Sequence, residues 1–478
     1  MKPFYITTTL PYVNAEPHIG FAMELIRADV IVRAKKFSGY EVFFNTGTDE
    51  HGTKIHRKAK DLNIDTQVYV DGVAQKFKDL IPMLGISPDV NFIRTTDAHH
   101  ITSAQSFWLT VKKNGFIYKK NYSIKYCVGC ELEKTESELI DDRCTLHPLT
   151  ELEIIQEENY FFKFSEFQKP LLKLYKNNPD FVLPHSRLNE IRAFVERGLE
   201  DFSISRLATK MPWGVAVPDD KDHVMYVWFD ALVDYISAIG WPDKKDIFNK
   251  WWVESGGVVQ YCGKDNLRQQ AAMWQAMLMA AGLTPSKAVI VDGFITGEGG
   301  IKMSKSLGNT VNPVDLVNEY GTDAVRYFMT RELSPFEDSP FTPEKFKEAY
   351  NTNLANGIGN LTSRIMKMSS THISDPIKIK SKAFPAEYQA SIEIYDLQKA
   401  SDIIWKHITE LDQRIQKEKP FSIIKEDLKK GKVIIIELVQ GLSWIADMLK
   451  PFLPTTSDMI LECIAKNEMP VTPLFLRK

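Results

Sequence analysis

The 478-residue sequence has few cysteines, little net charge and no long apolar run. Five cysteines are too few for a disulfide framework in a chain of this length, and their clustering favours a metal site in a reducing compartment. Without ~18 consecutive apolar residues we expect no membrane span, and without a leader pattern at residues 1–10 we expect no secretory signal and a cytoplasmic protein. With a net charge of −3, binding to nucleic acid would require local basic patches.

Two lysines follow an apolar run late in the chain. Residues 288–295 predict a buried strand, residues 297–300 (GEGG) predict a mobile loop, and Lys302 and Lys305 follow within the segment KMSKS. Lysine is a mobile point charge that can follow phosphate groups as they leave, so the segment indicates a polyphosphate site. For this segment considered alone, an exposed basic turn is the stronger alternative.

His18 stands at the start of the first predicted helix, after a predicted strand over residues 4–9 and a loop over residues 10–17. Backbone N–H groups at a helix N-terminus favour an anion, the imidazole adds a donor, and Gly20 allows a ligand to approach the backbone. A capping or surface histidine is the alternative reading of His18 when it is considered alone.

Together, PHIG at residues 17–20 and KMSKS at residues 302–306 resemble the two signature motifs of class I aminoacyl-tRNA synthetases. The segments TTTLPYVNAEPHIG and FFNTGTDEHGTKI narrow the resemblance to the methionyl-tRNA synthetase family. The resemblance implies that methionine is activated by ATP with Mg²⁺ and transferred to tRNA(Met). It also implies that the catalytic residues, which stabilise the departing pyrophosphate, are His18, Lys302 and Lys305.

The resemblance assigns further ligand contacts residue by residue. The aspartate of GTDEHG, Asp49, would hold the methionine amino group, although a helix-capping turn is the alternative for this segment. The implied methionine site consists of Leu10, Tyr12, Asp49, Arg206, Trp228, Ala231, Tyr235 and Gln270. A surface ion pair is the alternative for Arg206, and a place in the core is the alternative for the aromatic residues at 228–235. The implied ATP site consists of His18, Gly20, Gly263, Asp265, Lys302 and Lys305. The chain departs from the usual family residues at Phe21 and Gln270, where relatives carry histidine.

Four residues in the middle of the chain have the spacing of a metal knuckle. The pattern is C-x2-C, thirteen residues, then C-x2-H, formed by Cys127, Cys130, Cys144 and His147. Three thiolates and one imidazole suit tetrahedral Zn²⁺, and a set of four protein ligands leaves no position for a reacting water. We therefore expect one structural zinc ion.

We predict an α/β fold, in which a doubly wound parallel nucleotide-binding sheet of the Rossmann type carries a zinc-knuckle insertion and is followed by an all-α anticodon-binding bundle. Residues 225–229 predict a strand, and the apolar residues between 392 and 415 predict one continuous stripe. The predicted segments are the first catalytic half (1–115), the insertion (116–220, with the knuckle at about 125–150), the second catalytic half (221–310), a linking helical segment (311–350) and the bundle (351–478).

The bundle would recognise the tRNA anticodon. The resemblance places Asn360, Arg364 and Phe421 at anticodon-reading positions, and Phe421 replaces the tryptophan of many relatives; a core aromatic is the alternative. Because the chain shows no appended β-barrel module, we expect a monomer. Two other functions remain open: a sibling synthetase for leucine, isoleucine, valine or cysteine, and a tRNA-binding module that has lost catalysis.

Overall fold

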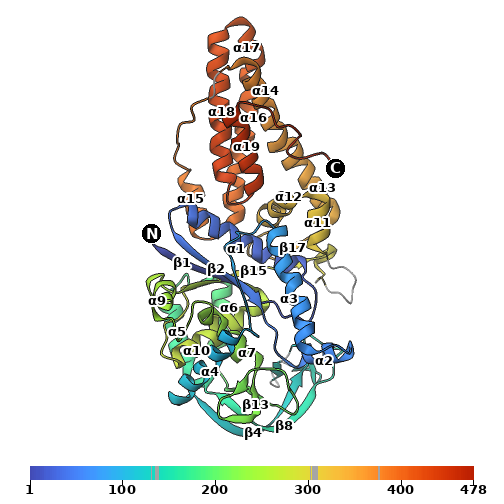
Figure 1. Ribbon diagram of the computed structural model, residues 1–478, viewed down its shortest axis with the longest axis vertical. Helices are drawn as coiled ribbons and strands as arrows, with labels where there is room; N and C mark the ends of the chain where they lie inside the picture. The colour runs from blue at the N-terminus through green and yellow to red at the C-terminus, as the bar shows by residue number, and fades with distance from the viewer. Residues whose placement is uncertain (131, 135–138, 302, 304–310, 375–376) are drawn as a thin grey trace. The chain divides into compact units, whose positions relative to one another are not determined.

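The computed structural model describes the whole chain except residues 131, 135–138, 302, 304–310 and 375–376 (Figure 1). It divides into two compact units. The first contains residues 1–16, 40–79 and 89–291, and the second contains residues 17–39, 80–88 and 292–478. Within the described residues, no helix has both the length and the apolar character that a membrane crossing requires.

A six-stranded sheet forms the centre of the first unit, in the order β3-β2-β1-β14-β15-β9. Parallel pairing joins β1 to β2 and β14, β2 to β3, and β15 to β9. The strands are β1 (Pro3–Thr8), β2 (Glu41–Thr48), β3 (Asn91–Arg94), β9 (Val182–Leu183), β14 (Val258–Gly263) and β15 (Ala288–Asp292). The predicted doubly wound parallel fold is therefore confirmed.

The strand order changes direction at β1, because β2 and β3 extend to one side while β14 and β15 extend to the other. In an open parallel sheet, ligands bind beyond the carboxyl ends of the strands at such a switch point. Residues that directly follow β1, β2 and β14 are therefore brought to one place. Helices of this unit include α2 (Thr53–Asp61), α4 (Ala98–Lys113), α5 (Gln168–Asn177), α6 (His185–Glu196), α9 (Lys245–Phe248) and α10 (Trp274–Ala280). Helix α3 (Thr66–Met83) begins in this unit, and its last residues belong to the second unit.

The insertion forms small antiparallel sheets and also returns one strand, β9, to the main sheet, which the sequence did not reveal. One insertion sheet consists of β10 (Phe202–Ser203), β8 (Glu153–Phe162), β4 (Ile117–Cys127) and β5 (Leu132–Lys134). A second sheet consists of β11 (Ser205–Leu207), β13 (Asp220–Met225) and β12 (Ala216–Val217). A separate short pair is formed by β6 (Leu139–Ile140) and β7 (Arg143–Cys144), and β7 contains one of the predicted metal ligands.

The prediction of a strand over residues 225–229 is wrong. Strand β13 ends at Met225, and helix α7 (Val227–Ala231) begins immediately after it, followed by α8 (Asp234–Ser237). The N–H groups of Phe229 and Asp230 both donate to the carbonyl of Tyr226, at 2.9 and 3.2 Å. All five residues of the run MYVWF are apolar, so its hydrophobic pattern could not distinguish a buried strand from a buried helical turn.

The second unit is mostly helical (Figure 1). It begins with α1 (Ile19–Phe37) and contains the short parallel pair of β16 (Ile295–Thr296) and β17 (Ser339–Pro340). The other helical segments are α11 (Pro313–Tyr320), α12 (Thr322–Tyr327), η8 (Phe328–Glu332), α13 (Pro343–Ala349), η9 (Tyr350–Gly359), α14 (Asn360–His372), α15 (Ala386–Glu393), α16 (Leu397–Glu418), α17 (Pro420–Glu426), α18 (Leu428–Leu449) and α19 (Pro454–Lys466). The predicted helical bundle is confirmed.

The predicted stripe between residues 392 and 415 is interrupted. Tyr395 has a φ of 62°, in the left-handed region, and this residue separates α15 from α16. The Asp396 side chain then accepts a hydrogen bond from the N–H of Lys399 and caps α16. The apolar spacing alone did not reveal this break, because apolar residues on both sides of it, such as Ile392 and Leu397, are buried.

Buried ion pairs hold α1 within the second unit. Asp29 and Arg326 are both fully buried and lie 2.8 Å apart, and Arg27 lies 3.0 Å from Asp292. Burial alone would raise the pKa of Asp29, but the charges of Arg326 and Arg33 and a hydrogen bond from Ser87 outweigh it and lower that pKa. Arg326 also donates to four backbone carbonyls, those of Leu84, Gly85, Pro451 and Phe452.

We expect Arg326→Met to destabilise the protein by about 3–5 kcal/mol, because it removes the fully buried cation beside Asp29 and leaves that carboxylate to the partly exposed Arg33. The free energy of unfolding from urea titration measures the change. Arg414→Met is the matched control, since Arg414 pairs with Glu418 and Glu437 on a surface where side chains are about one-third exposed, and it should cost at most ~1 kcal/mol. Equal losses in both variants would contradict the assignment.

Candidate active site

A small cavity lies at the switch point of the first unit. Its volume is about 20 Å³, and its lining residues come from the ends of β1 and β2, from α7 and α8, and from the segment after β14. These residues are Thr9, Leu10, Asp49, Trp228, Ala231, Leu232, Tyr235, Asn266 and Gln270. Six of the eight residues predicted for the methionine site are therefore brought together, whereas Tyr12 and Arg206 are not among the lining residues.

The apolar wall of the cavity is one face of the α7–α8 segment. Trp228, Ala231, Leu232 and Tyr235 are spaced i, i+3, i+4 and i+7, which is the period of one helical face. The helix that replaces the predicted strand is thus what places these four side chains side by side. A thioether or another slender apolar group would find aromatic surface here.

Asp49 supplies a carboxylate to the cavity and is itself 5% exposed. The loop after β1 is fixed to it through the backbone, because the Asp49 N–H donates to the Pro11 carbonyl at 3.0 Å and the Val13 N–H donates to the Asp49 carbonyl at 3.1 Å. Tyr12 and Asp49 are partners in an isolated parallel β-bridge formed by these backbone hydrogen bonds. A carboxylate next to apolar walls suits an amphipathic ligand that carries a positive charge.

The two residues after Asp49 have other partners. Glu50 accepts hydrogen bonds from Arg94 at 2.7 and 2.8 Å and from the hydroxyls of Thr48 and Thr96. The Nδ1 atom of His51 lies 2.6 Å from the Asp230 carboxylate. Of the three polar residues in this turn, Asp49 is therefore the one that faces the cavity.

Gln270 closes the base of the cavity through a network of side-chain amides. Its Nε2 donates to the Tyr235 hydroxyl at 2.6 Å, and its Oε1 accepts from Gln260. Gln275 and Ser286 extend the network behind it. Gln270 thus fixes the orientation of Tyr235, a role for which an amide with both a donor and an acceptor is suited.

Arg206 lies on β11 and is 5% exposed. It donates to the Ser203 hydroxyl at 2.8 Å and to the Ser205 carbonyl at 2.7 Å, and it stacks over the ring of Tyr226 at 4.7 Å. Because Tyr226 is the residue before α7, Arg206 supports the start of the helix that forms the apolar wall.

The residues predicted for ATP are placed in both units. In the first unit, Gly263 ends β14, and Asp265 lies in the short 3-10 turn Lys264–Asn266 that follows. In the second unit, His18 is the N-cap of α1, and its Nδ1 accepts from the Gly20 N–H at 3.1 Å. Phe21 is buried in α1. The predicted Lys302 and Lys305 lie outside the described residues.

The predicted metal ligands converge within the insertion. One donor atom from each of Cys127, Cys130, Cys144 and His147 lies within 4.8 Å of all the others. Cys130 Sγ is 3.4 Å from Cys144 Sγ and 3.2 Å from His147 Nδ1. Ligands of one tetrahedral zinc lie roughly 3.5–3.8 Å apart, so these donors fit such an ion after small adjustments.

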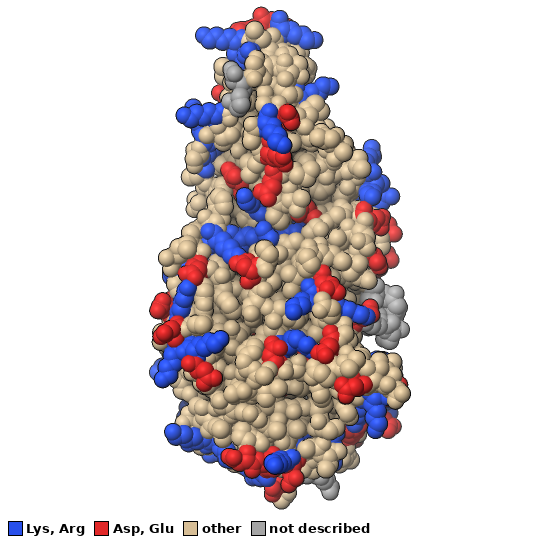
Figure 2. All heavy atoms as spheres, viewed as in Figure 1, with Lys and Arg blue, Asp and Glu red and all other residues tan. Residues whose placement is uncertain are grey.

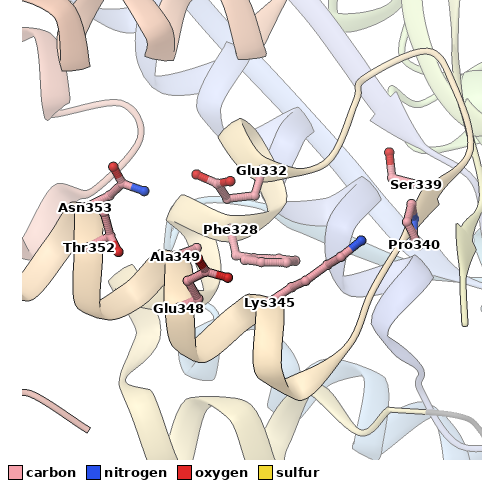
Figure 3. Close-up of a pocket in the computed structure, with 9 residues that line it drawn as sticks. All are labelled: Phe328, Glu332, Ser339, Pro340, Lys345, Glu348, Ala349, Thr352 and Asn353. Carbon is pink, nitrogen blue, oxygen red and sulfur yellow. The ribbon is translucent and has the colours of Figure 1, made fainter. Parts of the chain in front are cut away.

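A larger cavity in the second unit shows that volume alone does not locate the site. It measures about 340 Å³ and has the Phe328 ring at its base, with polar side chains from α13 and η9 around it (Figure 3). Lys345, Glu348 and Thr352 follow one another about a helical turn apart on its rim. None of the residues predicted for substrate, ATP, metal or anticodon lines this cavity.

The predicted anticodon residues lie on the bundle. Asn360 is exposed at the start of α14, and Arg364 on the same helix donates to the Asp412 carboxylate. Phe421, on α17, is 48% exposed, so the alternative of a core aromatic is wrong. Charges of both signs are interspersed over the face in Figure 2, and Lys and Arg border the end of the bundle where Figure 1 places α17.

Three lining residues were missed by the sequence analysis: Thr9, Leu232 and Asn266. Each carried a signal that could have found it. Thr9 and Asn266 come just after strands of a predicted parallel sheet, where polar groups gather. Leu232 completes the helical period of Trp228, Ala231 and Tyr235, but only once residues 227–237 are recognised as helical.

Comparison with known proteins gives a consistent result. The family described as "tRNA synthetases class I (M)" matches residues 4–137 and 129–366. A methionine–tRNA ligase of Thermotoga maritima is 39% identical over 484 residues, covering 98% of this chain and 76% of that protein. A methionine–tRNA ligase of Rickettsia typhi is 39% identical, covering 97% of this chain and 94% of that protein.

A solved structure is similar throughout. Mycobacterium tuberculosis methionyl-tRNA synthetase in complex with methionyl-adenylate superposes with a TM-score of 0.90 and 33% identity, covering the whole of both chains. The free form of the same enzyme gives a TM-score of 0.85 with 30% identity.

We expect Gly129→Ala to weaken metal binding, because a Cβ at this position would lie 2.6 Å from the His147 ring and displace that ligand. Metal analysis of chelator-free protein should find about one zinc per chain in the wild type and less in the variant. Gly72→Ala is the matched control, since a Cβ there meets nothing within 4 Å. Equal zinc content in all three proteins would contradict a ligand role for His147.

Proposed function

The chain belongs to the methionine branch of the class I tRNA synthetases, and from this premise we propose which of its residues carry each step. The activity is that of a methionine–tRNA ligase. ATP activates methionine to methionyl-adenylate with release of pyrophosphate. A ribose hydroxyl at the 3′ end of tRNA then attacks the carbonyl of the adenylate, which transfers the methionyl group and releases AMP. The observation that carries the assignment of the site is the cavity at the switch point, where one carboxylate meets aromatic and apolar walls.

Methionine binds with its ammonium group at Asp49 and its side chain against Trp228, Ala231 and Tyr235. Opposite charge and short range favour this placement of the ammonium, and aromatic rings favour contact with the thioether sulfur. A cavity of about 20 Å³ holds about one water molecule, so methionine enters only if lining side chains move. Leu10 and Leu232 are apolar members of that lining.

In the first step, a methionine carboxylate oxygen attacks the α-phosphorus of ATP, and the bond to pyrophosphate breaks. Negative charge grows on the leaving pyrophosphate, so cationic groups aimed at it accelerate the step. His18, Lys302 and Lys305 supply these groups, while Gly263 and Asp265 hold the adenosine. Mg²⁺ accompanies ATP and neutralises part of the phosphate charge. No covalent enzyme intermediate is needed, because positioning and charge stabilisation suffice.

The insertion holds one structural Zn²⁺ through Cys127, Cys130, Cys144 and His147. All four donors are protein groups, and the two cysteine-containing turns carry little apolar core of their own. When bound, the ion stabilises the fold of this knuckle and takes no part in the reaction.

The end of the bundle binds the anticodon of tRNA(Met). Phe421 is exposed there, and exposed lysines surround it in the chain at positions 417, 419, 425, 429 and 430. An aromatic face offers a stacking surface for an unpaired base, and the lysines supply the local basic patch that a chain of net charge −3 requires. Asn360 and Arg364 would read base edges, with Arg364 oriented by Asp412.

The test of the function is amino-acid-dependent exchange of pyrophosphate into ATP. We expect methionine to support exchange far better than leucine, isoleucine, valine or cysteine at the same concentration, because the aromatic walls of the cavity favour contact with an unbranched thioether. Exchange with another of these amino acids would reassign the substrate. Absence of exchange with all five would contradict the proposed activity.

Phe421→Ala should weaken tRNA(Met) binding by about 1–3 kcal/mol, because it removes a stacking surface. Because Phe421 is half exposed, the thermal unfolding midpoint should change little, and methionine-dependent pyrophosphate exchange should stay at the wild-type rate. Phe421→Trp is the control that retains stacking and should bind normally. If tRNA with a changed anticodon loses affinity equally for wild type and Phe421→Ala, then Phe421 does not contact the anticodon.

A further inference from the structure

Asp230 is a buried carboxylate that the proposed mechanism does not use. It lies on α7 between the cavity residues Trp228 and Ala231 and is itself inaccessible to solvent. His51 Nδ1 lies 2.6 Å from one of its oxygens, and His100 Nε2 lies 2.8 Å from the other. We call these three residues the Asp230 clamp.

The protonation of the clamp follows from its contacts. Burial alone would raise the pKa of Asp230, but the charge of His51 and the hydrogen bonds from both histidines outweigh it and bring the pKa to about 2. An ionised carboxylate only accepts hydrogen bonds, so His51 donates through Nδ1 and His100 through Nε2. The other ring nitrogen of His100 lies 2.9 Å from the Ser237 hydroxyl, which fixes that ring at both ends.

The clamp connects two segments that line the cavity. His51 is two residues beyond Asp49, which lines one wall, and Asp230 is flanked by the residues of α7 that line the other. His100 adds a third element, α4. The turn that contains His51 is also held from the far side, because Trp213 Nε1 donates to the Glu50 carbonyl at 2.6 Å and the Gly52 N–H donates to the Trp213 carbonyl.

We propose that the Asp230 clamp is a positioning group that sets the affinity for methionine, by holding the Asp49 carboxylate at a fixed place relative to the α7 wall. The proposal rests on the proposed function, since it takes the small cavity as the methionine site. The clamp does not touch the substrate. It acts through Asp49, so its loss weakens methionine binding in the ground state and the transition state alike, which raises the KM for methionine and spares kcat.

A second buried carboxylate provides an internal comparison. Asp234 lies one helical turn after Asp230 and is equally inaccessible, but its hydrogen bond comes from a neutral amide, Asn45, at 3.1 Å. Burial raises the pKa of Asp234 well above its usual range, whereas the contacts of Asp230 lower its pKa. Asn has nearly the size and shape of aspartic acid, so Asp234→Asn alters a buried carboxyl held by Asn45, whereas Asp230→Asn alters the one held by His51 and His100.

The experiment compares full-length wild type with His51→Ala, His51→Asn and Asp234→Asn. We measure methionine-dependent pyrophosphate exchange, the calorimetric Kd for methionine and the thermal unfolding midpoint. His51→Ala should raise the KM and Kd for methionine by about tenfold or more, the factor expected for losing a hydrogen bond to a charged group, with the KM for ATP unchanged and kcat within about twofold. His51→Asn places an amide N–H near the former Nδ1 and should restore most of the affinity.

The control variant Asp234→Asn should keep the wild-type KM for methionine. A lower unfolding midpoint in His51→Ala with an unchanged methionine Kd would overturn the proposal, as would equal defects in His51→Ala and His51→Asn. If His51→Ala does not fold, Asp230→Asn keeps the size of the side chain and carries the same expectation. Failure of the proposed function would look different, because wild type itself would then show no methionine-dependent exchange.

Discussion

Parallel pairing of β1 with both β2 and β14 is the constraint on which the candidate site depends. Parallel strands end at the same edge of a sheet, so segments that are far apart in sequence meet beyond that edge. Leu10, Asp49 and Asn266 each lie just after one of these three strands, and they line one cavity. Contacts between the loops are not needed to bring them together, because the pairing of the strands already places their ends side by side.

The sheet delivers these loops to one place, and buried charges then hold them there. Glu50 is paired with Arg94 and His51 with Asp230, so the two residues after Asp49 are both fixed. Breaking a buried pair is costly because it leaves a charge without compensation in a region of low polarity. Each such pair therefore favours one conformation of its loop, because other conformations would break the pair and raise the free energy. The same logic applies to Asp29 and Arg326 in the second unit, where the loop near residue 85 and the turn near residue 451 are both tied to the pair.

Much of this could be predicted from sequence, and the limits have physical causes. The spacing of four residues led directly to the cysteine cluster, and the resemblance to methionyl-tRNA synthetases implied most of the cavity lining. The run at residues 225–229 was misassigned because every one of its residues is apolar, so neither a period of 2 nor of 3.6 stands out. The role of Asp230 was invisible, because its partners at positions 51 and 100 are set by the fold and not by spacing. The exposure of Phe421 also required coordinates, since an aromatic residue after proline fits a core as well as a surface.

The division of the chain into units limits how it can be dissected. Helix α1 follows the first strand of the sheet, yet it belongs to the second unit, and the chain passes between units after residues 16, 39, 79, 88 and 291. A fragment ending at residue 291 would retain Arg27 and Asp29 on α1 but lose Asp292 and Arg326, their buried counter-charges. The sheet-bearing half is therefore not a portable module. Any shortened version of this protein would have to neutralise these two side chains, for example with apolar residues of similar volume, before α1 could be expected to fold without the helical half.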